Sequence, residues 1–196
     1  MAIHTIGDSH SYSGWPPGTI THHLGPILCY SFGKQNLKRF DIRNLYLNEN
    51  DTIVFCFGEI DCRCHIHKYV NEYTNHESII DTIIDNYINA INMNLIENQT
   101  KIKVCIYNVV PTIQKFNTVE NEEYPFLGSD EERKTYVLYF NKKLKSKCEE
   151  YGFIFFDIYD NYIDKNGFMR KDMSDGEVHI MEGSHLKDFI ITNQLI

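Results

Sequence analysis

A serine lies near the amino terminus in the sequence Gly7-Asp8-Ser9-His10, directly after the short apolar run 2–6. Such a run predicts a buried strand, and residues that follow a strand in an α/β protein reach the crevice where ligands bind. A serine hydroxyl is a weak nucleophile on its own, so it requires a base and donors for a developing oxyanion. The rest of the chain supplies candidates for both.

The candidate base is a histidine near the carboxyl end. His179 lies four positions after Asp175, and a carboxylate that fixes the tautomer of a histidine allows it to accept and return a serine proton. A second pair, Glu182 and His185, has a similar layout. We favour His179, because His185 falls where a last helix should begin and Glu182 and Ser184 suit its start. The second pair remains the alternative.

The candidate oxyanion donors follow two further predicted strands. Gly25 comes after the strand predicted at 19–22, and a glycine allows a backbone N–H to approach an oxyanion closely. The strand predicted at 52–57 is followed by Gly58-Glu59-Ile60-Asp61-Cys62-Arg63. Two acids and an arginine are costly to bury without partners. These charges therefore predict either a local ion pair or part of the site.

The elements that must position these residues alternate between strands and helices. Continuous apolar runs predict strands at 2–6, 19–22, 52–57, 102–107 and 153–156, and such runs are typical of a parallel sheet covered on both faces. Isoleucines at helical spacing predict a helix around 79–91. A capping box at Ser129 and a glycine at position 152 delimit another, and 184–194 reads as a last helix. The pattern predicts an α/β doubly wound sandwich in one domain, 1–196.

Composition excludes several classes. The net charge of −8 argues against a general nucleic-acid binder. The chain contains no apolar run long enough for a membrane span and no signal-peptide pattern at its start, so we expect a cytoplasmic protein without a membrane partner. Zinc would require paired ligands, and the crowded segment 62–67 offers no second pair; we expect no metal.

In chain order, four blocks of this sequence resemble those of the SGNH, or GDSL-like, hydrolase family: Gly7 to His10, Gly25, Gly58 to Asp61, and Asp175 to His179. The resemblance implies a flavodoxin-like three-layer α/β/α sandwich with a central, mostly parallel five-stranded sheet. It also implies Ser9 as nucleophile, acid and base from one late loop, and oxyanion donors from the backbone of Ser9 and Gly25. Family members cleave esters of lipids, sugars and other small molecules, and some transfer acetyl groups to carbohydrates.

Two departures from the family pattern matter. The third block usually carries an asparagine that donates to the oxyanion, and Ile60 stands in its place; Arg63 and Asn108 are the candidate replacements. The last block usually separates the acid from the histidine by two residues, whereas three residues separate them here. The other polar or glycine positions of the blocks are expected beside the oxyanion or the substrate: Asp8, His10, Gly58, Glu59 and Asp61.

We therefore predict a serine esterase or acyltransferase that acts through an acyl-serine on a small acyl ester, an O-acetyl group on a carbohydrate being favoured. No cofactor is needed for this hydrolysis. The alternative is a catalytically weak domain of the same fold that binds a glycan or a protein partner, and Ile60 is the feature that favours it.

Overall fold

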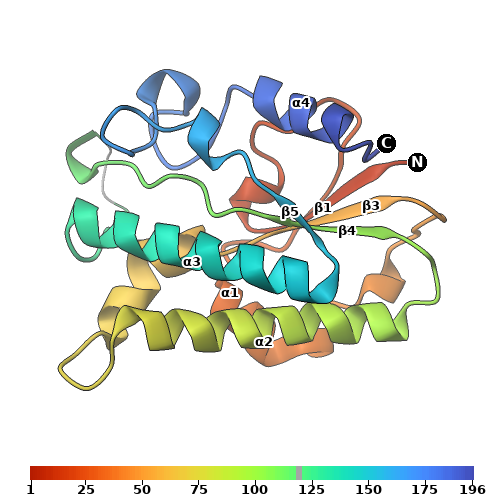
Figure 1. Ribbon diagram of the computed structural model, residues 1–196, viewed down its shortest axis with the longest axis horizontal. Helices are drawn as coiled ribbons and strands as arrows, with labels where there is room; N and C mark the ends of the chain where they lie inside the picture. The colour runs from red at the N-terminus through yellow and green to blue at the C-terminus, as the bar shows by residue number, and fades with distance from the viewer. Residues whose placement is uncertain (118–120) are drawn as a thin grey trace.

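The computed structural model describes residues 1–117 and 121–196, and within them five parallel strands form one sheet in the order β2-β1-β3-β4-β5 (Figure 1). The strands are β1 (Ile3–Gly7), β2 (Ile20–His23), β3 (Thr52–Cys56), β4 (Lys103–Tyr107) and β5 (Ile154–Phe156). Each lies within a residue or two of a strand predicted from an apolar run. The predicted α/β architecture with a five-stranded sheet is confirmed, and the sheet is parallel throughout.

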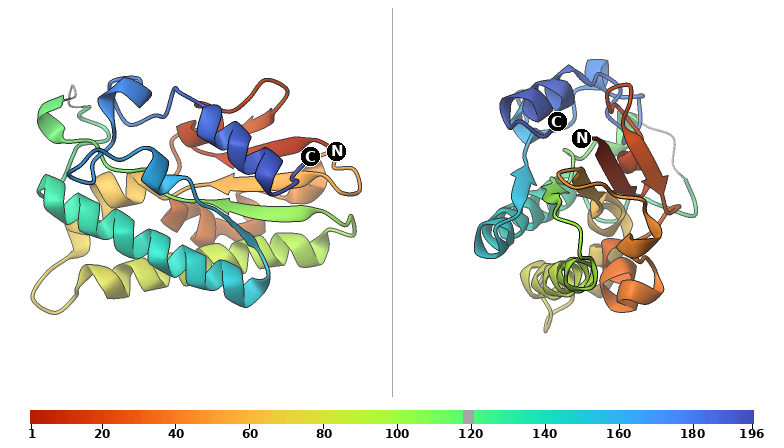
Figure 2. Two further views of the ribbon diagram at one scale, coloured as in Figure 1. Left: turned by 45° about the horizontal axis from the view of Figure 1, so that its top comes forward. Right: turned by 90° about the vertical axis from the view of Figure 1, so that its right-hand side faces the viewer.

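Helices cover both faces of the sheet (Figure 2). α1 (Cys29–Gln35), α2 (His76–Glu97) and α3 (Asp130–Tyr151) lie on one face, and α4 (Ser184–Thr192) lies on the other. Alternate strand residues supply the two cores. Ile53 and Phe55 pack toward α1 to α3, and Val54 and Cys56 pack toward α4. The three layers of a flavodoxin-like sandwich result.

Of the predicted helices, α3 has the expected ends, whereas α2 begins three residues before and ends six residues after the range 79–91, and α4 ends at Thr192, two residues before the predicted end. The side chain of Asn75 caps α2 through the N–H of Ser78. α3 begins with the predicted capping box between Ser129 and Glu132, and it ends at Gly152 with φ +71°. A left-handed residue at that place satisfies the last helical carbonyl groups.

α1 was not predicted, and its cap explains why. The carboxylate of Asp61 accepts hydrogen bonds from the N–H groups of Cys29 and Tyr30 at 2.6 and 3.1 Å. This cap comes from more than 30 positions further along the chain, and the residue before the helix, Leu28, makes no side-chain cap. The local sequence therefore contains no start signal for α1.

The strand order gathers the segments that follow β1, β2 and β3 at one edge of the sheet. Gly7, the last residue of β1, is level with His23 on one side and Cys56 on the other. The residues after these three positions include Ser9, Gly25 and Gly58. Three of the four sequence blocks therefore meet at the carboxyl ends of the three adjacent strands.

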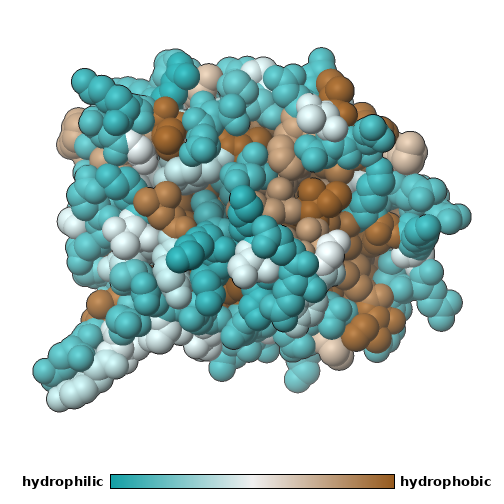
Figure 3. Space-filling view, in the orientation of Figure 1, coloured by the Kyte–Doolittle hydropathy of each residue, from teal (hydrophilic) through white to brown (hydrophobic). Residues whose placement is uncertain are grey.

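No helix in the described part of the chain is long and apolar enough to cross a membrane. Figure 3 shows apolar side chains gathered toward the end of the molecule where the two termini lie. A groove at the termini is lined by residues that include Met1, Ile191 and Ile196. This apolar surface lies over the amino ends of the strands, away from the edge that carries the four blocks.

Candidate active site

Ser9 begins a single 3₁₀ turn, Ser9–Ser11, that follows β1 directly. The buried carboxylate of Asp8 caps this turn by accepting the N–H of His10 at 2.9 Å. The side chain of Trp15 donates to the carbonyl of His10 at 2.9 Å, and its ring packs on Tyr107. The serine is thus held on a turn that is tied to the sheet at both ends.

The late loop brings a histidine and a carboxylate to Ser9. The Nε2 atom of His179 lies 2.7 Å from the Oγ atom of Ser9, and its Nδ1 atom lies 2.6 Å from Oδ2 of Asp175. Ser9 and His179 are 170 positions apart in the chain. The structure therefore aligns a hydroxyl, an imidazole and a carboxylate in one hydrogen-bonded row.

The three residues between Asp175 and His179 form a closed turn. The N–H of Asp175 donates to the carbonyl of His179 at 3.0 Å, and Gly176 has a φ of +86°, which favours glycine. The other carboxylate oxygen of Asp175 accepts the N–H of Glu177 at 2.8 Å. The longer spacing is therefore accommodated locally, and the carboxylate organises its own loop.

The electrostatics of this row favour a charged carboxylate. Partial burial alone would raise the pKa of Asp175, but the hydrogen bonds from His179 and from the Glu177 amide outweigh it, so the pKa is lowered. The side chains of Asp175 and His179 are 27% and 20% exposed. The carboxylate is therefore ionised at neutral pH and can hold the Nδ1–H of His179.

The alternative pair lies at the start of α4. The carboxylate of Glu182 accepts the N–H and the hydroxyl of Ser184 at 3.0 and 2.8 Å. The ring of His185 packs edge-on against Tyr162, with 5.4 Å between the ring centroids. These contacts belong to a helix start, whereas Ser9 contacts His179.

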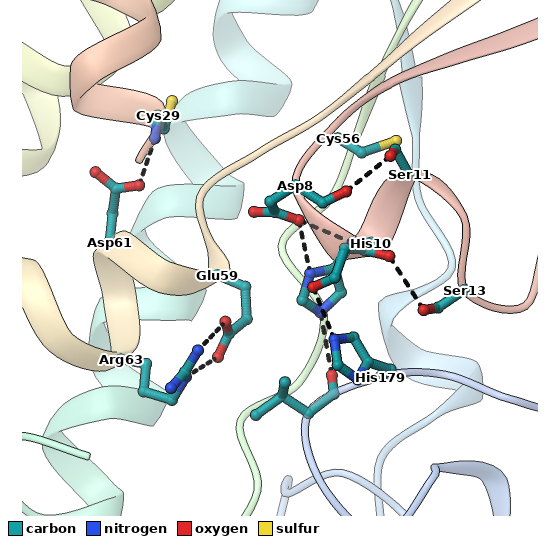
Figure 4. Close-up of polar contacts among 12 residues, drawn as sticks. Asp8, His10, Ser11, Ser13, Cys29, Cys56, Glu59, Asp61, Arg63 and His179 are labelled. Carbon is teal, nitrogen blue, oxygen red and sulfur yellow. Dashed lines mark hydrogen bonds and ion pairs between the residues drawn. The ribbon is translucent and has the colours of Figure 1, made fainter. Parts of the chain in front are cut away.

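His10 connects the first block to the late loop (Figure 4). Its Nδ1 atom lies 2.9 Å from Oδ1 of Asp8, and its Nε2 atom lies 3.1 Å from the carbonyl oxygen of Val178. Sequence reasoning placed Asp8 and His10 beside the site but gave neither a partner. The only sign of the contact in the sequence is position: His10 directly follows Ser9, and Val178 directly precedes His179.

The side chain of Arg63 is paired with a charged residue and with the backbone around the third block. Its guanidinium makes a double hydrogen bond with Glu59, at 2.7 and 3.1 Å, and also donates to the carbonyl of Tyr124. The backbone carbonyl of Arg63 accepts the N–H of Leu127 at 3.0 Å, and the guanidinium lies over the ring of Phe126. The predicted ion pair thus exists, and it fastens residues 124–127 beside the third block. This is the carboxyl-terminal part of the irregular segment 111–128, of which 118–120 lie outside the described residues.

The side chain of Asn108 makes hydrogen bonds to the backbone. Its Oδ1 accepts the N–H of Ile158 and its Nδ2 donates to the carbonyl of Val109, both at 2.9 Å. Asp61, the other acid of the third block, caps α1 and is fully buried. Arg63 and Asn108, the two candidate replacements for the absent asparagine, therefore both make hydrogen bonds within the protein, although the guanidinium and the amide each keep N–H bonds beyond those already used.

The glycines of the second and third sequence blocks, Gly25 and Gly58, differ in what the fold requires of them. Gly25 has a φ of +83° with open space where a Cβ would be, and no acceptor for its N–H lies among the described residues. Gly58 has a φ of +115°, and a Cβ there would lie 2.7 Å from the side chain of Val109. Gly58 is therefore required by packing, whereas Gly25 leaves a backbone donor unused.

A groove of about 330 Å³ lies between the turn after β2 and the turn after β3, and Ser9, Gly25 and His179 are not among its lining residues. β1, which carries Ser9, lies between these two strands. The groove is lined by polar and apolar residues that include Pro26, Leu28, Gln35, Arg39, Ile60, His65, Lys68 and Tyr124. A second hollow shares His65 and continues along the rings of Tyr30 and Tyr69.

The cysteine and histidine side chains of the segment 62–67 do not point toward one common site. The thiol of Cys64 donates to the carbonyl of Ile60 at 3.1 Å, and Nδ1 of His67 lies 3.1 Å from the hydroxyl of Tyr136. Within residues 1–117 and 121–196, no group of three or more histidine, cysteine or acidic side chains is placed to hold a metal ion. All six cysteines are buried and unpaired.

Comparison with solved structures matches this arrangement to one fold. The chain resembles a GDSL-like lipase from Bacteroides thetaiotaomicron, with a TM-score of 0.65 over 99% of this chain and 87% of the other at 15% identity. The chain has the fold of the GDSL hydrolases. A lipase/acylhydrolase from Enterococcus faecalis (TM-score 0.58, 14% identity, 100% and 96% covered) and a phospholipase A1 from Streptomyces albidoflavus (0.56, 9%, 100% and 99%) share it.

The likeness concerns the three-dimensional arrangement, since the identities are low. No protein-family model and no curated protein matches the sequence significantly.

Proposed function

We propose that the protein is a serine ester hydrolase or acyltransferase in which Ser9 is the nucleophile, His179 the base and Asp175 the carboxylate that orients it. The row of two short hydrogen bonds, from Ser9 to His179 and from His179 to Asp175, carries this proposal. The GDSL-like lipolytic proteins of the same fold support ester bonds as the target.

In the proposed reaction His179 accepts the Ser9 proton on Nε2 while the Ser9 oxygen bonds to the acyl carbon. The tetrahedral intermediate collapses to an acyl-serine, and His179 returns the proton to the leaving alcohol. Water or an acceptor hydroxyl then attacks the acyl-serine with the same base. Asp175 keeps the proton of His179 on Nδ1 and stabilises the imidazolium that forms at each step.

The oxyanion is proposed to bind the backbone N–H groups of Ser9 and Gly25. The unused N–H of Gly25 supports this role. A missing side-chain donor typically costs about 100- to 1,000-fold in turnover. We therefore expect slow hydrolysis of simple esters.

For the substrate we propose an O-acetyl group on a carbohydrate. The groove that begins at Pro26 and the hollow that shares His65 with it combine amide, guanidinium and imidazole groups with tyrosine rings, which suits hydroxyl groups and the flat faces of a sugar. The apolar surface near the termini lies at the other end of the sheet. A short acyl group on a polar alcohol fits this distribution better than a long lipid chain.

The test compares wild type, Ser9→Ala and the exposed control Ser146→Ala in hydrolysis of p-nitrophenyl acetate. We expect Ser9→Ala to lose the activity and Ser146→Ala to retain it. An aryl phosphonate should add its mass to Ser9 only in proteins that have the hydroxyl. His179→Ala should abolish activity and His185→Ala should not; the reverse result would move the base to α4. Release of acetate from acetylated oligosaccharides against p-nitrophenyl palmitate then tests the substrate.

A second candidate is a glycan- or partner-binding domain with little catalysis, favoured by Ile60 and by the commitment of Arg63 and Asn108 to other partners. Equal hydrolysis rates for wild type and Ser9→Ala, with no phosphonate adduct, would support this candidate.

A further inference from the structure

His10 is buried and lies between two hydrogen-bond acceptors. It is 5% exposed; its Nδ1 faces a carboxylate oxygen of Asp8 at 2.9 Å and its Nε2 faces the carbonyl oxygen of Val178 at 3.1 Å. A neutral imidazole carries one N–H only, so it can donate to one of these acceptors. Both bonds form at once only if both nitrogens are protonated. The geometry therefore requires His10 as an imidazolium.

The surroundings of His10 favour this charge. Asp8 comes from the end of β1, and a small cavity beside it is also lined by Glu59 from after β3 and by Tyr107 from β4. Burial alone would lower the pKa of His10, but the charge and hydrogen bond of Asp8, with Glu59 further away, raise it to about 9. The ring of His179 is also close, with 5.2 Å between the ring centroids, and Glu59 is itself paired with Arg63.

We propose that the His10 imidazolium is a positioning residue that clamps the late loop against the serine turn and so sets the distance between Ser9 and His179. The proposal rests on the function proposed above. His10 is the next residue after Ser9, and Val178 is the residue before His179. The clamp therefore runs beside the Ser9–His179 hydrogen bond and joins the backbones on which both residues lie.

Removal of the His10 proton should open the clamp on one side. The remaining N–H should stay with the Asp8 carboxylate, because a charged acceptor makes the stronger bond. Nε2 would then present a lone pair to the Val178 carbonyl, and the late loop would lose its tie. We expect kcat/KM of the wild type to fall in one ionisation near pH 9, the value set by Asp8 and Glu59.

Two isosteric variants separate the two bonds. The amide nitrogen of His10→Gln takes the place of Nε2 and can still donate to Val178, whereas that of His10→Asn takes the place of Nδ1 and can reach only Asp8. With p-nitrophenyl acetate as the probe, we expect His10→Gln to retain most of kcat/KM at neutral pH and to lack the fall near pH 9. We expect His10→Asn to lose on the order of 10- to 100-fold at every pH, since a displacement of about 1 Å in a catalytic group costs this much. An equal alkaline fall in wild type and His10→Gln would overturn the proposal.

A measurement without catalysis keeps this test separate from the proposed function. In ¹⁵N-labelled wild type, both ring nitrogens of His10 should have imidazolium shifts at neutral pH and should titrate near pH 9. Amide hydrogen exchange in 175–180 should quicken in His10→Asn and not in His10→Gln. If wild type shows no hydrolysis but these signals appear, the clamp stands and the proposed activity fails. A neutral His10 at neutral pH would refute the clamp itself.

Discussion

Replacement of Asp175 by asparagine is the sharpest test of the proposed base. The amide preserves the shape of the side chain, and its oxygen can still accept the N–H of Glu177, which Asp175 accepts at 2.8 Å. The other end of the amide, however, presents an N–H₂ group to Nδ1 of His179, where the carboxylate oxygen lies at 2.6 Å. His179 must then carry its proton on Nε2, facing Ser9, and it can no longer accept the serine proton.

The expected loss follows from this change of tautomer. It costs about 10⁴-fold in kcat where the triad is well shielded from water. Because the side chain of Asp175 is 27% exposed, solvent can offset part of the effect, and we expect a loss of about 10³- to 10⁴-fold, or roughly 4 to 5.5 kcal/mol of transition-state stabilisation. KM for p-nitrophenyl acetate should change little, since the lost interaction develops in the transition state.

The matched control is Asp172→Asn. Asp172 is a surface carboxylate on the same segment that pairs with Arg170 at 2.6 Å, and its replacement should leave kcat unchanged. Thermal unfolding of both variants checks that the fold persists. If Asp175→Asn stays within about tenfold of the wild type while Ser9→Ala is inactive, Asp175 does not orient the base and the reasoning is refuted.

Three further predictions concern the surroundings of the site. Gly25→Ala should destabilise the fold by about 1–2 kcal/mol, because the φ of Gly25 is +83°. It should also lower kcat by up to about 100-fold, because the backbone N–H would move away from the oxyanion; an unchanged kcat would exclude this donor. Glu59→Gln should cost about 3–5 kcal/mol in urea unfolding by leaving the buried guanidinium of Arg63 unpaired, and Arg63→Met should recover part of that loss; additive losses would contradict the pair. The pKa of His10 is raised from 6.5 to about 9, which should contribute about 3 kcal/mol to the free energy of unfolding. This contribution should be complete below pH 6.5 and should be lost as the pH rises through 9. A difference in unfolding free energy between wild type and His10→Gln that does not change with pH would contradict this prediction.

The sequence predicted the segments of the candidate site and its three central residues, but only some of the contacts around them. The strand–loop pattern indicated that Ser9, Gly25 and Gly58 lie at strand ends, and parallel strands bring such ends together. The resemblance to the family also named His179 and Asp175 as the partners of Ser9, and they lie in contact. The partners of Asp61 and Asn108 could not be predicted, because they lie at distant positions of the chain. From the sequence, Arg63 could be either an oxyanion donor or part of an ion pair. The structure shows its hydrogen bonds to Glu59 and to the Tyr124 carbonyl.

What the sequence alone determined was the set of elements whose signals are local. Apolar runs fixed the strands, and the capping box at Ser129 with the glycine at 152 fixed α3, because these signals act over a few neighbouring residues. The tertiary structure alone decided the start of α1, capped by Asp61 from across the fold. It alone decided that His179 rather than His185 contacts Ser9, and that His10 has two acceptors. The contacts of Asp61 with α1, of His10 with Val178 and of His179 with Ser9 join residues 31 to 170 positions apart, and no local pattern specifies which distant atoms will meet once the chain has folded.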